Sequence, residues 1–333
     1  MTGICTRKRL RKGRNLLKKP IQLTENVFLI DGYDLGMTER TGAYVLMEEE
    51  ITLIETSASP SVPYILSGLK SLGIAPEEIK YVIVTHIHLD HSGGAGLLLE
   101  HCPKAKVVVH KKGARHLANP SRLIASAKAV YGEKFNSLFD PILPIPEDRL
   151  LIKNDQETLQ IGENCLLSFY DSPGHANHHF SIYHPNVAGI FTGDTAGIYY
   201  PQLKRQGIEF YIPTTSPNQF DPEKMLQSIN IFKSLNAQRL FFGHFGMSDN
   251  PSETYKQVEA WLPVFISVAQ RAFEEAVDFE TRTRLASERL FQKLKEDLLE
   301  KGVKEEDPIF EILALDLEIS SMGLIDYLTK QIS

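Results

Sequence analysis

Three histidines and an aspartate stand within six residues of the segment 85–91 (THIHLDH), which follows a short apolar run. Alternate residues of an extended segment point to the same side, so His86 and His88 can reach one ion together. Asp90 and His91 must then turn toward a neighbouring point, which the following Ser-Gly-Gly permits. Imidazole nitrogen and carboxylate oxygen are ligands that zinc accepts. The segment therefore predicts a metal site.

Three later polar residues each follow a glycine at the end of an expected strand: His175, Asp194 and His244. A residue without Cβ relaxes such a turn and leaves room for the side chain that follows. Any one of the three could be an ordinary turn residue. Their occurrence together, after the histidine cluster, favours a shared site.

These segments resemble the motifs of a known family. The run 85–94 (THIHLDHSGG) looks like the HxHxDH signature of the metallo-β-lactamase superfamily, and the segments 171–175 (DSPGH), 191–194 (FTGD) and 243–244 (GH) resemble its later landmarks in the same order. The resemblance covers roughly residues 25–250. It implies an α/β fold (α+β in some schemes), a four-layer αββα sandwich with the metals at one edge between two sheets.

The resemblance also implies a set of metal ligands. These are His86, His88 and His175 for one ion, Asp90, His91 and His244 for a second, and Asp194 as the bridge between them. One segment departs from the family pattern, because Glu55-Thr56-Ser57 stands where many members carry Asp-Thr-Gly after the third strand. That usual aspartate supports the site from behind the ligands, so the geometry of this loop stays open.

Two divalent ions that share a carboxylate suit hydrolysis, because they acidify a bridging water and clamp the attacking and departing oxygens. With Asp90 and Asp194 as catalytic carboxylates, we expect a metal-bridging hydroxide to act on a small ester, thioester or lactone. Two Zn²⁺ per chain are expected because imidazole dominates the ligand set, and Mn²⁺ or Fe²⁺ also fit a nitrogen- and oxygen-ligated site. A phosphodiesterase or nuclease of the same superfamily is one alternative, and a mononuclear-iron persulfide dioxygenase is another. His88 stands where flavodiiron proteins carry glutamate, which argues against that redox role.

Residues next to these ligands are candidates for supporting roles. Tyr199 and Tyr200 follow Asp194 at a strand end, where a hydroxyl could contact the substrate. His178 and His179 could orient a ligand from behind it. The other histidines are expected to be structural or exposed: His101, His110, His116 and His184. The cysteines are isolated and form neither a disulfide framework nor a CxxC pair: Cys5, Cys102 and Cys165.

The elements that must position these residues follow from hydrophobic periodicity and turn signals. Strands are expected at 27–31, 43–47, 51–55, 81–84, 106–110, 150–153, 157–161, 165–170, 180–183, 189–191 and 239–242, and helices at 62–72, 94–101 and 111–118. Residues 121–139 are expected to be partly helical. A long loop is expected over 195–220, and Asp221-Pro222-Glu223 has the order of an N-cap, a proline at N1 and an acid.

Beyond residue 252 the pattern is almost wholly helical, so we expect a helical C-terminal appendage. The predicted division is a basic tail over 1–20, a catalytic domain over 21–252 and an α-helical region over 253–333. A chain of 333 residues, 42% hydrophobic and 23% charged, is long enough for this organisation.

The net charge of −6 hides an asymmetry, because residues 1–20 hold eight Lys or Arg and no acid. The rest of the chain is therefore near −14, which argues against nucleic acid as the main substrate and favours a small molecule. No stretch approaches the ~20 apolar residues of a membrane span, and the tail lacks the apolar core of a secretory signal. A cytoplasmic setting is the expectation. Whether the chain forms a homodimer is open.

Overall fold

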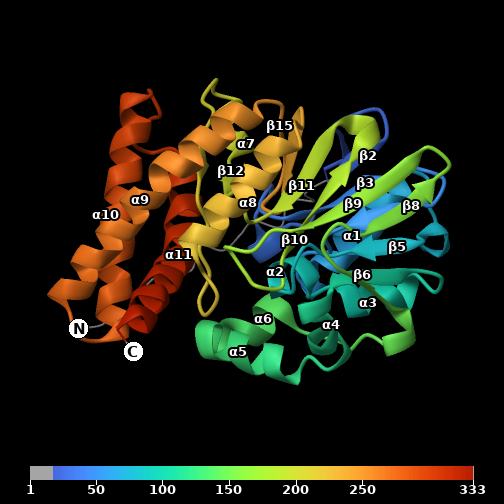
Figure 1. The fold of residues 1–333 in the computed structure, drawn as a ribbon, viewed down its shortest axis with the longest axis horizontal. Coiled ribbons are helices and arrows are strands. Elements are labelled where there is room, and N and C mark those ends of the chain that lie inside the picture. The colour runs from blue at the N-terminus through green and yellow to red at the C-terminus, as the bar shows by residue number, and fades with distance from the viewer. Residues whose placement is uncertain (1–17, 333) are drawn as a thin grey trace.

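Two β-sheets face each other, with helices on both outer sides, in the computed structural model, which describes residues 18–332 (Figure 1). The first sheet has seven strands in sequence order: β1 (Ile21–Gln22), β2 (Val27–Asp31), β3 (Gly42–Leu46), β4 (Thr52–Ile54), β5 (Tyr81–Ile83), β6 (Lys106–His110) and β7 (Leu150–Lys153). The second has the order β15-β14-β11-β10-β9-β8: β8 (Thr158–Gly162), β9 (Cys165–Asp171), β10 (Phe180–His184), β11 (Gly189–Gly193), β14 (Arg239–Phe242) and β15 (Met247–Ser248). Two short strands pair separately: β12 (Ile198–Tyr199) and β13 (Tyr211–Ile212).

Eleven α-helices lie among and around these strands in the described residues. They are α1 (Val62–Ser71), α2 (Leu89–Ser92), α3 (Ala95–His101), α4 (Lys111–Ala118), α5 (Ser121–Tyr131), α6 (Phe135–Phe139), α7 (Pro201–Lys204), α8 (Pro222–Ser234), α9 (Pro251–Glu275), α10 (Phe279–Glu300) and α11 (Ile309–Gln331). Most of the predicted basic tail over 1–20 lies outside the described residues.

Apolar side chains that alternate along the strands pack on both faces of each sheet. Val108 of β6 and Phe241 of β14 pack into the space between the two sheets. Their neighbours point the other way: Val107 packs outward with the helices that cover the first sheet, and Leu240 and Phe242 pack outward with those that cover the second. Successive side chains of a strand face opposite sides, so these apolar runs serve both faces of each sheet. The predicted αββα sandwich is confirmed.

Strand directions bring several strand ends to one edge of the sandwich. β11 and β14 are parallel, and β9 runs in the same direction as β11 because both are antiparallel to β10. In the first sheet, β5 runs parallel to β4 and β6. The loops that leave the carboxyl ends of β5, β9, β11 and β14 carry the predicted ligands, and they meet at that edge.

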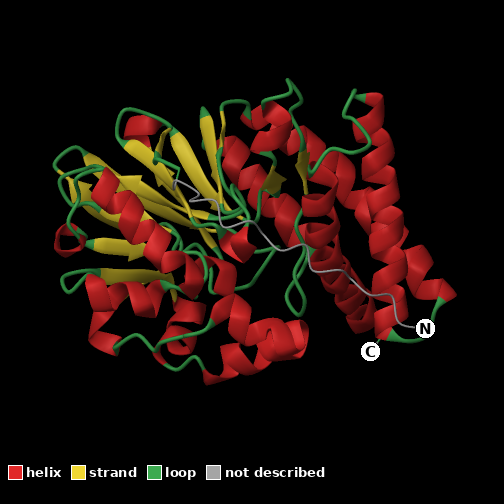
Figure 2. Cartoon of the chain, turned by 180° about the vertical axis from the view of Figure 1, so that it is seen from behind, coloured by secondary structure: helices red, strands yellow, loops and turns green. Residues whose placement is uncertain are grey.

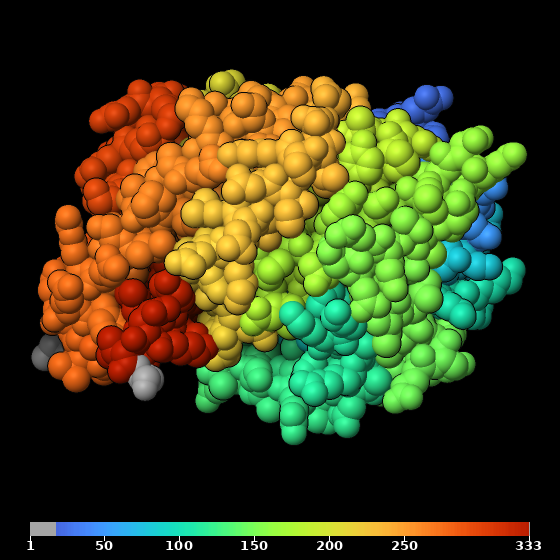
Figure 3. Space-filling view, in the orientation of Figure 1, coloured from blue at the N-terminus to red at the C-terminus, as the bar shows by residue number. Residues whose placement is uncertain are grey.

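The C-terminal helices α9 to α11 form one flank of the molecule (orange to red in Figure 1), and Figure 2 shows the same flank from behind. Their buried side chains, such as Leu262, Phe265 and Leu317, belong to the apolar cluster that also contains Phe242 of the second sheet. In the space-filling view, α8 and α9 lie directly against one another and beside the second sheet (Figure 3). The first of these helices, α9, begins at Pro251. The division into two domains at residue 252 stays a prediction.

Most predicted elements lie within one or two residues of the observed ones, and several coincide, such as α4 and β6. The predicted N-cap is confirmed, since the Asp221 side chain accepts a hydrogen bond from the Lys224 N–H at 3.1 Å. The expected loop over 195–220 is more structured than predicted, because it contains β12, α7 and β13. Within residues 18–332, every helix is too short or too polar to cross a membrane.

Candidate metal centre

The predicted ligands follow four strands whose carboxyl ends meet. His86 and His88 follow β5, His175 follows β9, Asp194 follows β11 and His244 follows β14. The short helix α2 begins directly after His88 and turns Asp90 and His91 back toward the same point. The structure thus brings together all seven residues that the resemblance implies, although they span 159 positions of the chain.

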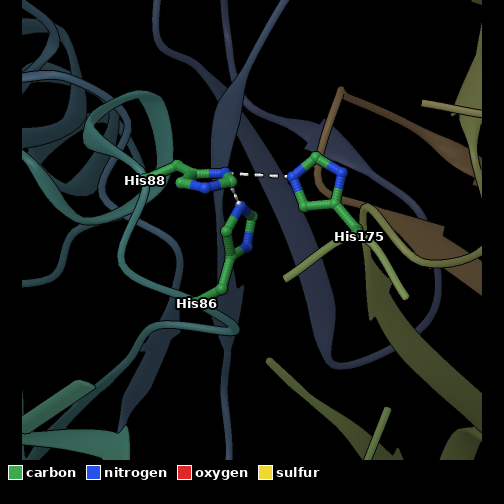
Figure 4. A group of neighbouring side chains, drawn as sticks. All are labelled: His86, His88 and His175. Carbon is green, nitrogen blue, oxygen red and sulfur yellow. Dashed lines mark hydrogen bonds between the residues drawn. The ribbon is translucent and has the colours of Figure 1, made fainter. Parts of the chain in front are cut away.

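Three histidines form the first group of donors (Figure 4). The Nδ1 atom of His88 lies 2.9 Å from Nε2 of His86 and 2.9 Å from Nε2 of His175. The three rings are turned edge to face, with centroids 4.5 to 5.0 Å apart. One nitrogen of each ring therefore points at a common centre, as the ligands of one ion would.

The second group consists of Asp90, His91 and His244, which lie close enough to share an ion. The Nε2 atoms of His91 and His244 lie 3.5 and 3.7 Å from Oδ2 of Asp90. Asp194 lies between the two groups: its Oδ2 is 3.2 Å from Nε2 of His244 and 3.5 Å from Nε2 of His175, and its Oδ1 is 3.3 Å from Nε2 of His91. This is the position that a bridging carboxylate requires.

Hydrogen bonds on the outer side hold the rings in place. The Thr85 hydroxyl donates to the buried Glu55 carboxylate, and its oxygen lies 3.0 Å from Nδ1 of His86. In the same way Nδ1 of His175 lies 3.3 Å from the Thr214 carbonyl. A donor proton on each Nδ1 leaves Nε2 with its lone pair directed to the centre.

The side chain of Glu55 shows how the segment Glu55-Thr56-Ser57, which departs from the family pattern, contacts the site. Its backbone has φ +67°, and its carboxylate also accepts the Thr85 N–H at 3.2 Å. Its other oxygen lies 3.7 Å from Nδ1 of His91. Glu55 therefore supports His86 through Thr85 and faces His91 directly. The unusual residue at this position was visible in the sequence, but the direction of its side chain was not.

The two histidines predicted to support the site differ in their contacts. His179 Nε2 accepts the Asp194 N–H at 3.2 Å, while its Nδ1 lies 2.8 Å from the Ser172 hydroxyl. His179 thus holds the backbone of the proposed bridging residue. His178 Nδ1 lies 3.5 Å from the Ile87 N–H, and its ring lies parallel to that of His86, with centroids 6.3 Å apart.

Two glycines make room for this packing. A Cβ at Gly193, which has φ +51°, would lie 2.3 Å from Nε2 of His179. A Cβ at Gly243 would lie 2.6 Å from Oδ1 of Asp194 and 2.7 Å from Cε1 of His91. Contacts this short are not tolerated between heavy atoms, so these two turns depend on the missing side chain.

Burial and mutual repulsion keep part of the cluster neutral. Burial, with His91 and His88 nearby, holds the pKa of His86 well below its usual value, and burial together with His175 lowers the pKa of His88 to about 3. Burial opposes ionisation of Asp194, but His91 and His244 outweigh it and hold the pKa of this carboxyl well below its usual range. Burial likewise disfavours a charged His91, yet Asp194 and Asp90 hold its pKa well above 6.5.

The seven side chains are better suited to binding a divalent cation than to forming hydrogen bonds with one another. Asp194 Oδ1, Glu55 Oε2 and both ring nitrogens of His91 are buried without a hydrogen-bond partner. Leaving a buried polar atom unpaired costs about 1–3 kcal/mol, so Asp194 Oδ1 and His91 Nε2, which face each other at 3.3 Å, fit the ligands of a divalent cation. Five imidazoles and two carboxylates are suited to zinc, with manganese or iron as chemically reasonable substitutes.

A cavity of about 440 Å³ opens onto the two groups and is lined by His88, Asp90, His175, Asp194 and His244 at its floor. Its walls come from α5, from the loop 214–219 and from α11. The wall residues include apolar side chains, such as Leu123, Ala127, Val130 and Phe139, and polar ones, such as Arg40, Thr214, Ser216 and Asp316. Its volume lies in the range of small-molecule sites, roughly 300–1,000 Å³.

Tyr199 and Tyr200, predicted to contact substrate, do not line this cavity. The Tyr199 ring is buried and lies parallel to those of Tyr211 and Phe242, with centroids 5.5 Å away in both cases. Tyr200 is 2% exposed and donates its hydroxyl to Asp316 at 2.9 Å. Stacking holds Tyr199 in the core, and the contact with Asp316 of α11 does the same for Tyr200, so the structure gives both a core position in place of the predicted one.

Arg40 and Asp316 are among the cavity residues that the sequence did not reveal. Arg40 Nη1 lies 2.8 Å from Asp316 Oδ1, and its Nε lies 3.4 Å from Asp34 Oδ2. Both carboxylates are buried and the guanidinium is nearly so, because its side chain is 11% exposed. Arg40 and Asp316 are 276 positions apart, which is why no local pattern could have paired them.

Two facing sheets with a histidine and carboxylate centre at one edge define a class of metal-binding fold. The family model of the metallo-beta-lactamase superfamily matches residues 38–244, which is more than half of the chain. The chain therefore belongs to this superfamily, whose members are generally metallo-hydrolases.

Individual relatives extend the match. The chain is 29% identical over 208 residues to the metallo-beta-lactamase fold-containing protein ST1585 of Sulfurisphaera tokodaii, covering 61% of this chain and 72% of that protein. It is 24% identical over 240 residues to the beta-lactamase-like protein 2 homolog of Caenorhabditis elegans, covering 71% of this chain and 67% of that protein.

Solved structures show the same fold. The crystal structure of ST1585 aligns with a TM-score of 0.62 at 21% identity, covering 90% of this chain and 98% of that one. The metallo-beta-lactamase family protein TTHA1429 of Thermus thermophilus aligns with a TM-score of 0.65 at 16% identity, covering 93% of this chain and 95% of that one.

Proposed function

We propose that this chain is a hydrolase that uses two divalent ions, zinc by preference, on a small ester, thioester or lactone. The observation that carries the proposal is the pair of donor groups that share Asp194 at the floor of the cavity. The three histidines of the first group would be the ligands of one ion. Asp90, His91 and His244 would be the ligands of the other.

When bound, a pair of divalent ions would lower the pKa of a bound water to ~7 and polarise the oxygen of the group under attack. The chain's own residues then set the geometry. Asp194, ionised and held through its N–H by His179, keeps the two donor groups at a constant separation. Asp90 lines the cavity, where its carboxylate can accept a hydrogen bond from the attacking water and so orient it.

The shape of the cavity supports a small substrate with an apolar portion. Leu123, Ala127 and Val130 of α5 offer an apolar wall beside the centre, which suits the acyl part of an ester or the ring of a lactone. The loop around Thr214 and Ser216 also lines the cavity and offers hydroxyls that can bind a polar leaving group. A cavity of about 440 Å³ is of the size of small-molecule sites, which favours a small substrate.

The proposal is tested by assaying the zinc and manganese forms with lactones, thioesters, carboxylic esters and phosphodiesters. We expect turnover of at least one of the first three, and a loss of more than about 100-fold in kcat/KM in His86→Ala and in Asp194→Ala. His101→Ala is the matched control, because this exposed histidine lies at the end of α3 away from the cavity, and it should keep full activity.

Two outcomes would contradict the proposal. Turnover of phosphodiesters alone would favour the nuclease branch. Oxygen uptake with a persulfide by the iron-loaded chain, without hydrolysis by the zinc form, would favour a dioxygenase. Metal analysis after zinc loading adds a separate check on the two-ion arrangement, since Asp194→Ala should bind less zinc than the unaltered chain.

A further inference from the structure

A second cluster of metal-binding side chains lies at the opposite end of the β-sandwich from the centre described above. Cys165 is the first residue of β9 and His184 is the last residue of β10, while Glu48 stands in the turn between β3 and β4. The seven residues of β9 separate Cys165 from Asp171 at the other edge, which is about 20 Å at ~3.3 Å per residue. The cluster is therefore independent of the histidine centre.

Strand alternation directs the two sheet residues inward. Cys165 packs in the apolar cluster between the sheets together with Leu167 and Phe169, its alternate neighbours on β9. Phe180 and Ile182 of β10 pack in the same layer, so His184, the next alternate residue, projects to the same side. Cys165 is 1% exposed and His184 is fully buried.

The three donor atoms are near one another, and the only direct bond among them is a weak one between the Cys165 sulfur and the His184 ring. Glu48 Oε1 lies 3.6 Å from His184 Nε2, which is too long for a hydrogen bond, and Glu48 Oε1 is buried without any hydrogen-bond partner. Cys165 Sγ lies 3.7 Å from His184 Nε2, and all three donors lie within 4.8 Å of one another. Donors that share a tetrahedral ion, at ~2.0 Å for nitrogen and oxygen and ~2.3 Å for sulfur, lie about 3.3–3.6 Å apart.

From these positions we propose that Glu48, Cys165 and His184 form a site for one divalent cation of the zinc class, whose fourth position is open to solvent. The ion joins the turn after β3 of the first sheet to β9 and β10 of the second. Binding displaces the Sγ proton of Cys165 to solvent, because the thiolate is the ligand form of cysteine. The side chain of Glu48 is 12% exposed, so this turn gives the ion access from solvent.

The donor chemistry distinguishes this site from the other one. Sulfur, nitrogen and oxygen together suit zinc and cobalt, whereas the histidine centre offers only nitrogen and oxygen. Cobalt(II) bound by a thiolate has a charge-transfer band in the near ultraviolet, which imidazole and carboxylate ligands alone do not produce. This band therefore reports on Cys165 specifically, whatever occupies the histidine centre.

The experiment loads the metal-depleted full chain with Co²⁺ and records the near-ultraviolet spectrum. We expect a thiolate-to-cobalt band that Cys165→Ala abolishes and that Asp194→Ala, altered only in the histidine centre, retains. Cys102→Ala and Cys5→Ala are the matched controls and should retain the band. After zinc loading and dialysis, Cys165→Ala should hold about one zinc per chain less than the unaltered chain.

Glu48→Gln keeps the size of the side chain and leaves the thiol in place, so it tests the site even where Cys165→Ala weakens the fold. It should show the band with a Co²⁺ affinity about 10–100-fold lower. The proposal is overturned if the unaltered chain shows no thiolate band or if Cys165→Ala keeps the band. It is also overturned if the thiolate band of Glu48→Gln develops at the same Co²⁺ concentration as that of the unaltered chain. The cobalt spectrum is recorded without any substrate. Failure of the proposed hydrolase activity would therefore leave this result unaffected.

Discussion

At the scale of single residues, the candidate centre is a set of buried side chains, some of which are hydrogen-bonded on their outer side. Thr85, itself bonded to Glu55, lies against the outer nitrogen of His86, and the Thr214 carbonyl lies against that of His175. The inner atoms point at one another across contacts of 2.9 to 3.7 Å. Such an arrangement is costly in the absence of cations, because the charges and dipoles that remain are desolvated. It becomes favourable when cations occupy the two positions.

Gly193 offers a test at this scale. Gly193→Ala would place a Cβ 2.3 Å from His179 Nε2 at a residue with φ +51°, so His179 and Asp194 must both shift. We expect zinc affinity to fall about 10–100-fold, as for other groups that orient metal ligands, together with a lower free energy of unfolding. Zinc titration and urea unfolding measure the two effects.

Gly207→Ala is the matched control for Gly193→Ala. Gly207 has φ +81°, and a Cβ added there meets nothing within 4 Å. This variant should lose roughly 1–2 kcal/mol of stability from the left-handed backbone alone and should bind zinc normally. Equal zinc affinity in the two variants would show that contact with His179 does not position Asp194.

At the scale of elements, α11 is joined to the turn between β2 and β3 beside the cavity. Asp316 of α11 accepts hydrogen bonds from Arg40 at 2.8 Å and from the Tyr200 hydroxyl at 2.9 Å. Asp34 adds a second carboxylate 3.4 Å from Arg40. Arg40 is thereby held at the cavity wall by an ion pair that joins segments far apart in the chain.

Removing one charge of this buried pair should be more costly than removing one hydrogen bond. Asp316→Asn leaves Arg40 with only Asp34, and we expect the free energy of unfolding to fall by about 3 kcal/mol. Tyr200→Phe removes only the hydroxyl and should cost about 1.5 kcal/mol. Urea unfolding compares the two variants, and zinc content should stay unchanged in both. A smaller effect in Asp316→Asn than in Tyr200→Phe would refute the ion pair as the main connection.

At the scale of the whole molecule, the sandwich and the C-terminal helices share one apolar cluster. Phe242 of β14, Ile229 of α8 and Phe265 of α9 belong to it together with Leu313 and Leu317 of α11. The helices therefore cover the outer face of the second sheet as well as contributing Asp316 and Ile319 to the cavity wall. Both the stability of the chain and the shape of its candidate site depend on this flank.

The stability of the whole chain should respond to pH differently with and without zinc. In the metal-free chain, the pKa of His91 and that of His244 are raised above 6.5 by Asp194, despite the opposing effect of burial. A raised pKa contributes stability that is complete below about pH 6.5 and is lost as pH rises through the folded value. The same protons must leave before a cation binds.

The gain in melting temperature on adding zinc should therefore be small near pH 5.5 and should grow toward about pH 8. Thermal unfolding of metal-free and zinc-loaded chain across this range measures it. The metal-free chain alone serves as the reference, and its melting temperature should fall above about pH 6.5. A zinc effect that is constant with pH, or that declines as pH rises, would contradict this assignment of the protons.

Local patterns predicted much of the fold and the membership of the candidate site. Apolar alternation and turn residues located β2, β6 and α4 at their observed bounds, because the preference of each segment depends on its immediate neighbours. Motif order likewise selected the seven proposed ligands, since all of them lie in the segments that follow the carboxyl ends of β5, β9, β11 and β14. The short strands β12 and β13 escaped prediction because two residues carry no periodicity, and only their pairing with each other defines them.

The direction of side chains and the meeting of distant residues were decided by tertiary structure. Tyr199 and Tyr200 stand at the predicted strand end, yet packing against Tyr211 and contact with Asp316 turned them away from the cavity. Cys165 and His184 looked isolated in sequence and come together because the pairing of β9 with β10 places their ends side by side. Residue type and spacing determine which chemistry a segment can offer. Strand register and helix packing determine which distant groups share one ion or one cavity, because those contacts form only when the sheets face each other.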